Sequence, residues 1–226
     1  MNSPQHHQSA FLYSGLSRPA WVCSNVRQSA CLVGDGSPSM AGQKAKAASD
    51  ARIDLVSALA DPTNKDGFKV GIVDFAKKAK MVQQLTKASA LAGNVPSLST
   101  GCLGSATNIN AGLELALKML QEETKEPGIS YLRPVVLIFT DGCHNSGPSP
   151  ETVANDLKVI ADLVTIAFGT DADETLMRSL ASSPQHYYRC NSGQELRAFF
   201  AAVGHTLTQT RLAGQNATYG LATIVP

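Results

Sequence analysis

The sequence lacks the features that mark several specialised classes of protein. No apolar stretch approaches the roughly 20 residues that a membrane-spanning helix needs. Its 19 basic residues are balanced by 18 acidic ones and form no cluster, which argues against nucleic acid or an anionic membrane as a partner. The first residues show no basic start followed by an apolar segment, so we expect no secretion signal and a cytoplasmic location.

Cysteine is scarce, and its pattern argues against two further classes. The chain has 5 cysteines, an odd number, and no two of them form a CxxC pair. Reduced thiols fit this pattern better than a disulfide framework or a zinc site. The cysteine pattern therefore agrees with the cytoplasmic location.

Internal repeats and linkers rich in Gly, Pro or Ser are absent as well. We therefore expect one large domain in this chain of 226 residues, and its 43% hydrophobic residues suffice for a sizeable core. We place this domain at residues 25–210, followed by a C-terminal extension at residues 211–226. Residues 1–24 do not fit the pattern of the rest and form either a flexible tail or an added edge strand.

What the sequence does contain is a regular alternation of apolar runs and amphipathic segments. The runs cover Ala30–Val33, Val70–Phe75, Val135–Phe139 and Leu163–Phe168. Most of them are nearly continuous, as expected for strands that are covered on both faces. A weaker strand over Lys78–Leu85 follows its predecessor so closely that only a hairpin can join the two, so we expect it to be an antiparallel edge strand.

Helical patterns fill the gaps between these strands. Ser149 and Pro150 have the residue types of an N-cap and a first helical position, and Ser192 with Glu195 forms a capping box that opens the last helix. The segment QHYYRC, residues 185–190, is the expected last strand. The alternation predicts an α/β fold, with a doubly wound, mostly parallel central sheet, one antiparallel edge strand and helices on both faces. Apolar helical faces are formed by Ala48, Ala51, Leu55 and Leu59, by Ile109, Leu113, Ala116, Leu117 and Leu120, by Val153, Leu157 and Ile160, and by Leu196, Phe199, Phe200, Val203 and Leu207.

Polar oxygen side chains stand at three places where ligands bind in such a fold, near the carboxyl ends of the strands. Asp35, Ser37 and Ser39 alternate directly after the first apolar run. Thr107 precedes the second amphipathic helix, and Asp141 follows the third apolar run by two residues. Each segment alone is more typical of a turn or a helix cap.

Together the three segments supply two carboxylates and three hydroxyls to one rim of the sheet. Hard divalent cations prefer oxygen ligands, and Mg²⁺ takes six of them while keeping some waters. Two carboxylates balance the charge of such an ion. Because none of the five residues is His or Cys, zinc and copper are not expected. The set therefore predicts a bound Mg²⁺, with Mn²⁺ or Ca²⁺ as alternatives.

The segments DGSPSM, GSATNINAGL and IFTDG, in this order and spacing, resemble the metal-ion-dependent adhesion site of von Willebrand factor type A (vWA) domains. The resemblance spans roughly the whole expected domain and implies a Rossmann-like sheet with Mg²⁺ or Mn²⁺ at its top. It also implies that Ser37, Ser39 and Thr107 bind the metal directly, whereas Asp35 and Asp141 act largely through water. One coordination position is left for an acidic side chain of a partner protein.

Two regions depart from the family pattern. Pro38 stands between the two serines, where the family most often has Gly. Cys143, His144 and Asn145 follow the second aspartate in place of the usual Pro and Asn or Asp, and we expect His144 to be a solvated loop residue. The departures concern the rim and the choice of partner, because no ligand type is lost. The closing stretch ELRAFFAAVGHTLTQTR also looks like the last helix of small bacterial members encoded in tellurium-resistance and stress operons, beside a kinase and a phosphatase.

These observations favour a binding module, an intracellular adaptor that grips an acidic residue of a partner such as a kinase or phosphatase. The alternative is a Mg²⁺-dependent phosphoryl-transfer or hydrolytic enzyme, which needs a Lys or Arg clamp near the metal. No basic residue lies within a few positions of Asp35 or Asp141, and there is no Walker loop, so we expect no enzyme activity. A third alternative is a domain that keeps the fold but binds no metal. The partner, the metal affinity and the oligomeric state stay open.

Overall fold

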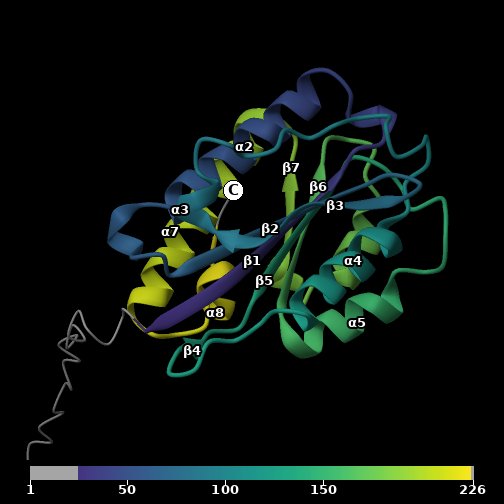
Figure 1. The fold of residues 1–226 in the computed structure, drawn as a ribbon. Coiled ribbons are helices and arrows are strands. Elements are labelled where there is room, and N and C mark those ends of the chain that lie inside the picture. The colour runs from purple at the N-terminus through teal and green to yellow at the C-terminus, as the bar shows by residue number, and fades with distance from the viewer. Residues whose placement is uncertain (1–24, 225–226) are drawn as a thin grey trace, which may run out of the picture.

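A computed structural model describes residues 25–224 and contains a single mixed sheet (Figure 1). Within these residues the strand order is β3-β2-β1-β5-β6-β7, and β4 pairs with the start of β1. The tail or edge strand predicted for residues 1–24 lies outside the described part. The strands are β1 (Val26–Asp35), β2 (Phe68–Phe75), β3 (Ala79–Lys87), β4 (Ser130–Tyr131), β5 (Val135–Thr140), β6 (Asp162–Phe168) and β7 (Tyr187–Cys190).

All neighbouring strands of the sheet run parallel except β2 and β3, which form the antiparallel pair at one edge. This confirms the predicted doubly wound sheet and its antiparallel edge strand. In the register, Gly34 lies opposite Asp74 of β2 on one side and opposite Phe139 of β5 on the other. The chain thus passes from β1 to β2 on one side and reaches β5 on the other side only later. This reversal opens a crevice at the carboxyl ends of β1 and β5.

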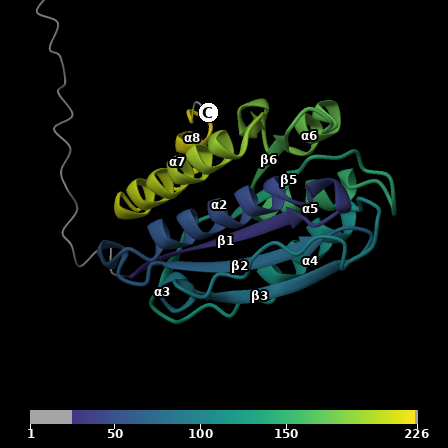
Figure 2. The same ribbon diagram turned by 90° about the horizontal axis from the view of Figure 1, so that it is seen from above.

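Helices cover both faces of the sheet, as Figure 2 shows from above. One core layer lies under α2, α3, α7 and α8, and the other lies under α4, α5 and α6. Short 3-10 turns cover Pro38–Met40, Pro62–Asn64 and Pro184–His186. The helices are α2 (Gln43–Leu59), α3 (Ala88–Leu91), α4 (Ile109–Gln121), α5 (Glu151–Ile160), α6 (Glu174–Leu180), α7 (Gly193–Leu212) and α8 (Thr218–Leu221).

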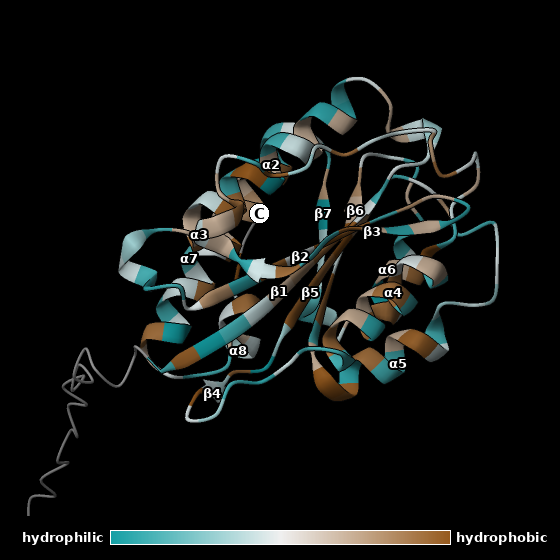
Figure 3. Ribbon diagram, viewed as in Figure 1, coloured by the Kyte–Doolittle hydropathy of each residue, from teal (hydrophilic) through white to brown (hydrophobic). Residues whose placement is uncertain are grey.

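The two core layers account for the continuous apolar runs of the strands. Along β1, Leu32 packs into the layer under α2 and α7, whereas its neighbours Cys31 and Val33 pack into the layer under α4 and α5. Nearly all side chains of the central strands are therefore buried, whichever face they point to. Figure 3 shows the consequence, with brown strands through the centre of the sheet and hydrophilic teal patches on the surrounding helices.

The strand β1 is longer than its apolar run, because polar residues in its first half are buried with partners. Gln28 Nε2 donates to the carbonyl oxygen of Arg133 at 2.9 Å, and Ser29 Oγ donates to Glu123 Oε1 at 2.7 Å. A buried polar group that is hydrogen-bonded costs little, so the strand continues through both residues. Apolar periodicity alone therefore underestimated the length of this strand.

The predicted helix starts are close to the observed ones. The α5 helix begins at Glu151, one residue later than predicted, although Pro150 already has helical dihedrals (φ −76°, ψ −4°). At α7, Ser192 Oγ accepts from the amide of Glu195 at 3.2 Å, as predicted. The returning contact differs from a standard capping box, because Glu195 Oε2 accepts from the amide of Asn191 at 2.8 Å.

The segment predicted as a C-terminal extension contributes to the fold. The α7 helix ends at Leu212, beyond the boundary placed at residue 210, and α8 follows it. Leu221 of α8 is buried in the layer under α2 and α7, and its carbonyl accepts from the hydroxyl of Tyr188. Of the helices described, none combines the length and apolarity that crossing a membrane requires.

Candidate metal centre

The carboxylate of Asp35 ends β1 and is fully buried at the crevice. Its Oδ1 accepts from the amide of Ser37 at 2.8 Å, and its Oδ2 accepts from Thr140 Oγ1 at 2.5 Å. Burial raises the pKa of Asp35, and the hydrogen bonds from Thr140 and Ser37 oppose that rise. Thr140 is a residue that the sequence analysis did not single out, although it directly precedes Asp141.

The two serines of the first loop connect the ends of β1 and β5. Ser37 Oγ lies 2.9 Å from Ser39 Oγ, and Ser39 Oγ donates to Asp141 Oδ1 at 2.7 Å. Between them, Pro38 is the first residue of a one-turn 3-10 helix, a position that needs no amide donor. The departure from the usual Gly is thus compatible with serines that lie side by side.

A second loop crosses close over Gly36. The amide of Gly101 donates to the carbonyl oxygen of Gly36 at 2.9 Å, and a Cβ added to Gly36 would lie 2.5 Å from the carbonyl oxygen of Ser99. Any side chain at position 36 would therefore push this loop away. Glycine is needed here for the close approach of two backbones.

Thr107 belongs to the third part of the site and is buried. Its amide donates to Asn145 Oδ1 at 2.9 Å, and its carbonyl oxygen accepts from the amide of Asn145 at 3.0 Å. These two bonds tie the loop before α4 to the loop after Asp141. A Cβ added to Gly142 would lie 3.4 Å from Thr107 Oγ1, so this hydroxyl faces the turn that follows Asp141.

Thr107 is not the N-cap of α4, although its position before the helix would have allowed that role. Asn108 is the N-cap, because its Oδ1 accepts from the amide of Ala111 at 3.1 Å. His144 is half-buried, and its Nδ1 accepts from the amide of Ile109 at 3.2 Å. The expectation of a solvated loop histidine is corrected in this respect, since His144 supports the start of α4.

The ammonium group of a lysine side chain also lies at the site. Lys44 Nζ donates to Asp141 Oδ2 in a salt bridge. Lys44 is distant from Asp141 in the sequence, but it is the second residue of α2, whose first turn follows the loop of Asp35, Ser37 and Ser39. No basic residue lies within a few positions of Asp35 or Asp141 in the sequence, but folding brings the ammonium of Lys44 to Asp141.

The donor set suits a hard divalent cation. The hydroxyls of Ser37 and Ser39 and the carboxylate of Asp141 are joined by the contacts above, Asp35 accepts from the Ser37 amide, and the Thr107 hydroxyl faces the turn after Asp141. Among the described residues there is no group of three or more His, Cys, Asp or Glu side chains that could hold a metal. A metal at this rim would therefore depend on hydroxyl oxygens, which suit Mg²⁺.

Residues 31–202, more than half of the chain, match the von Willebrand factor type A domain, and the chain belongs to this family. An uncharacterized protein of Synechocystis sp. is 27% identical over 163 residues, and the match covers 69% of this chain and 35% of that protein. The chain therefore spans about a third of the length of this relative.

Two solved structures illustrate the shared fold. Proximal thread matrix protein 1 from the mussel byssus, with a zinc-occupied MIDAS motif, has a TM-score of 0.64 at 21% identity over 82% of this chain and 46% of that chain. The vWF domain of the type V pili tip protein Mfa5 from Porphyromonas gingivalis has a TM-score of 0.67 at 13% identity over 82% of this chain and 96% of that chain. Likeness at this level of identity shows the Rossmann-like fold.

Domains of this family often act as metal-dependent adhesion or protein-binding modules, and their adhesion site holds a divalent cation. In the mussel protein that ion is zinc.

Proposed function

We propose that this chain is a metal-dependent protein-binding module that grips an acidic residue of a partner. Ser37, Ser39 and Thr107 would hold the ion directly, and Asp35 and Asp141 would balance its charge largely through water. The ion supplies an electrophilic position that accepts a carboxylate oxygen of the partner. The protein supplies the fixed oxygens around it.

The observation that carries this proposal is the linked set of oxygens at the ends of β1 and β5. Ser39 Oγ lies 2.7 Å from Asp141 Oδ1 and 2.9 Å from Ser37 Oγ, while two hydrogen bonds fix the Asp35 carboxylate. Groups held in this way need little rearrangement to surround an ion. A turn or a helix cap needs oxygens from its own loop only, whereas these oxygens come from loops that are far apart in the sequence.

An enzyme of phosphoryl transfer is the second candidate, and Lys44 is the observation in its favour. Such an enzyme needs a cation that faces the substrate. Lys44 instead pairs with the carboxylate of Asp141, which itself belongs to the proposed metal set. This pairing favours the binding module, and metal-dependent turnover of a phosphoester that is lost in Asp35→Ala would favour the enzyme.

The finer role that we propose is an intracellular, cytoplasmic adaptor in a stress or tellurite-resistance system with a kinase or phosphatase as partner. Its support is the likeness of the last helix to small bacterial members of the family. Deletion of the gene in its native cell tests this role through growth on tellurite. Unchanged growth under tellurite and other stresses would count against it.

The first experiment is calorimetric titration with Mg²⁺, Mn²⁺, Ca²⁺ and Zn²⁺. We expect one ion to bind wild type and a weaker affinity in Ser39→Ala, which removes a direct ligand. A Ser89→Ala variant is the matched control, since Ser89 lies outside the site and bonds to Asp66. Absence of any binding heat, with identical melting in metal and in chelator, would contradict the metal site.

The second experiment tests the partner. A pull-down from the native cell, with and without chelator, should retain a partner only when the metal is present. Acidic residues of that partner are then replaced one at a time, and one of them should abolish binding. Retention in chelator would mean that recognition lies elsewhere on the domain.

A further inference from the structure

Both oxygens of Asp141 are engaged, and one of them is held by a cation of the protein itself. Oδ1 accepts from Ser39 Oγ at 2.7 Å, and Oδ2 accepts from Lys44 Nζ. The side chain of Asp141 is 0% exposed, whereas that of Lys44 is 34% exposed. The carboxylate is thus fixed in the site, while the ammonium reaches it from the solvent side.

A metal and Lys44 would seek the same carboxylate. Asp35 and Asp141 carry two negative charges, and Lys44 neutralises one of them. A divalent ion beside Asp141 would bring two positive charges close to the ammonium, and the two cations would repel each other. With Lys44 moved away, the two carboxylates and the ion sum to zero charge.

The structure has room for Lys44 to move. A groove of about 720 Å³ lies between the first turns of α2 and α7, and Lys44 forms part of its wall together with Gly169 and Asn191. A Cβ added to Gly169 would lie 3.6 Å from Lys44 Nζ, so the wall beside the ammonium is bare of side chain. A flexible lysine at the end of a helix can turn into this groove by rotating its side chain alone.

We propose that Lys44 is a built-in counter-ion of the metal site, which a divalent cation must displace from Asp141. This inference rests on the proposed function, because it concerns the same site. Lys44 lowers the affinity for the metal and stabilises the protein when no metal is bound. After displacement its ammonium would lie in the groove between α2 and α7.

The test is calorimetric titration of the full chain with Mg²⁺ and with Mn²⁺ in four proteins. Lys44→Met removes the charge and keeps the length of the side chain, and Lys44→Arg keeps the charge. Lys46→Met is the matched control, because Lys46 lies two residues away and pairs with Asp50 at 2.8 Å instead of Asp141. We expect Lys44→Met to bind the metal about fivefold more tightly than wild type, while Lys44→Arg and Lys46→Met stay close to wild type.

Melting in chelator gives the second readout. Lys44→Met should melt at a lower temperature than wild type and should gain more from added metal. Equal or weaker metal binding by Lys44→Met, while wild type binds, overturns this inference and leaves the metal site standing. If neither protein binds a metal, both the metal site and the inference are wrong.

Discussion

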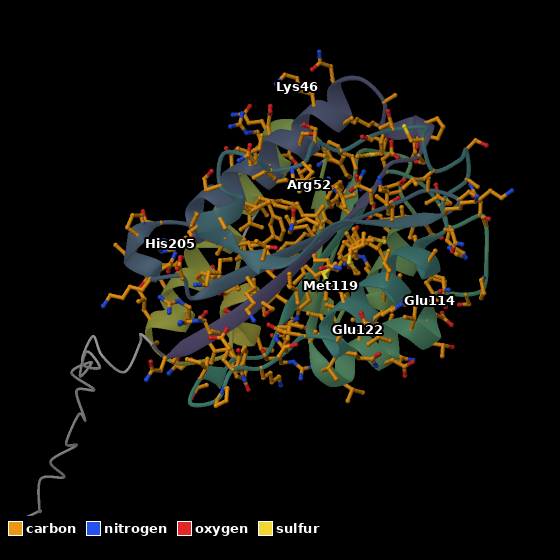
Figure 4. The ribbon with its side chains drawn as sticks, in the orientation of Figure 1. Lys46, Arg52, Glu114, Met119, Glu122 and His205 are labelled. Atoms are coloured by element: carbon orange, nitrogen blue, oxygen red, sulfur yellow. The ribbon has the colours of Figure 1, made fainter. Side chains whose placement is uncertain are left out.

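The α2 helix carries two basic side chains that pair with aspartates, one within β2 and one directly after β5, and the two pairs differ in burial. Arg52 Nη2 donates to Asp74 Oδ1 at 2.5 Å, with side-chain exposures of 0% and 4%. Lys44 pairs with Asp141 at the rim, where about a third of the lysine side chain is exposed. Figure 4 shows Arg52 between α2 and the sheet, whereas Lys46 lies on the outer side of the helix.

The surroundings of Arg52 show that it has no alternative position. Its guanidinium lies 5.5 Å from the ring centre of Phe139, and a Cβ added to Gly34 would lie 2.1 Å from Arg52 Nη2. Among the described residues, Arg52 Nε and Nη1 have no hydrogen-bond partner. The two salt bridges therefore differ in their role. The enclosed Arg52 holds α2 against the core, whereas Lys44, if displaced as we propose, leaves the carboxylate of Asp141 available to a metal.

The largest effect is expected from breaking the enclosed pair. Arg52→Met leaves Asp74 buried without its partner, which should cost about 3–5 kcal/mol of unfolding free energy. Urea denaturation measures this loss. The double variant Arg52→Met/Asp74→Asn removes both charges and should recover part of it, and a double variant as unstable as the single one would show that packing, not charge, is responsible.

The next effect comes from filling the space that the enclosed pair uses. Gly34→Ala places a methyl group against Arg52 and Phe139, and such overpacking should cost about 1–3 kcal/mol. Gly93→Ala is unsuitable as a control, because its φ of 87° would add strain. Ser57→Ala, at an exposed position of α2, is the control, and equal stability of the two variants would contradict the close contact at Gly34.

Salt should distinguish the two pairs. In chelator, Lys44→Met should cost about 1 kcal/mol at low salt, and this cost should shrink as salt screens the partly exposed pair. The cost of Arg52→Met should hardly depend on salt, because no solvent ions reach the enclosed pair. Denaturation of both variants at low and high salt measures the difference, and an equal salt response would remove the distinction drawn between them.

The smallest effect concerns Asp35, whose pKa is raised by burial. A raised pKa in the folded state means that this carboxyl stabilises the fold at acidic pH, and that the contribution is lost as pH rises through the raised pKa. Asp35→Asn mimics the protonated form, so in chelator at neutral pH it should melt at the same temperature as wild type or a few degrees higher. The gap should close toward acidic pH, and added metal should raise the melting temperature of wild type only. A variant that melts well below wild type in chelator would contradict the burial cost.

The sequence was sufficient for the sheet because the central strands are buried on both faces. A short continuous apolar run such as Val135–Phe139, bounded by polar residues and turns, is typical of such a strand. The connection after β2 is too short for a crossover, so the next strand could only pair with β2 in the antiparallel direction. The β4 strand was missed, since Ser130 and Tyr131 form only two ladder pairs and show no apolar pattern. The α6 helix was missed as well, because seven residues hold too few turns for a clear periodicity.

The sequence was sufficient to place the two aspartates of the candidate site together, but not to place Lys44 beside them. Asp35 and Asp141 follow buried strands, and the topology of a parallel sheet brings strand ends together whatever the details. Lys44 meets Asp141 across 97 residues of sequence, and that contact depends on the start and tilt of α2. No local pattern encodes the tilt of a helix, so only the structure could show the pair.

The two hydrogen bonds between Thr107 and Asn145 have a mechanical consequence. Together with the bond from the Ile109 amide to His144, they join the loop after β5 to the start of α4 and to the loop before it. A partner that pulls on the rim would load the β5 strand and the α4 helix at the same time. Because the force is divided between the central strand β5 and the helix α4, we expect the rim to resist separation of its loops.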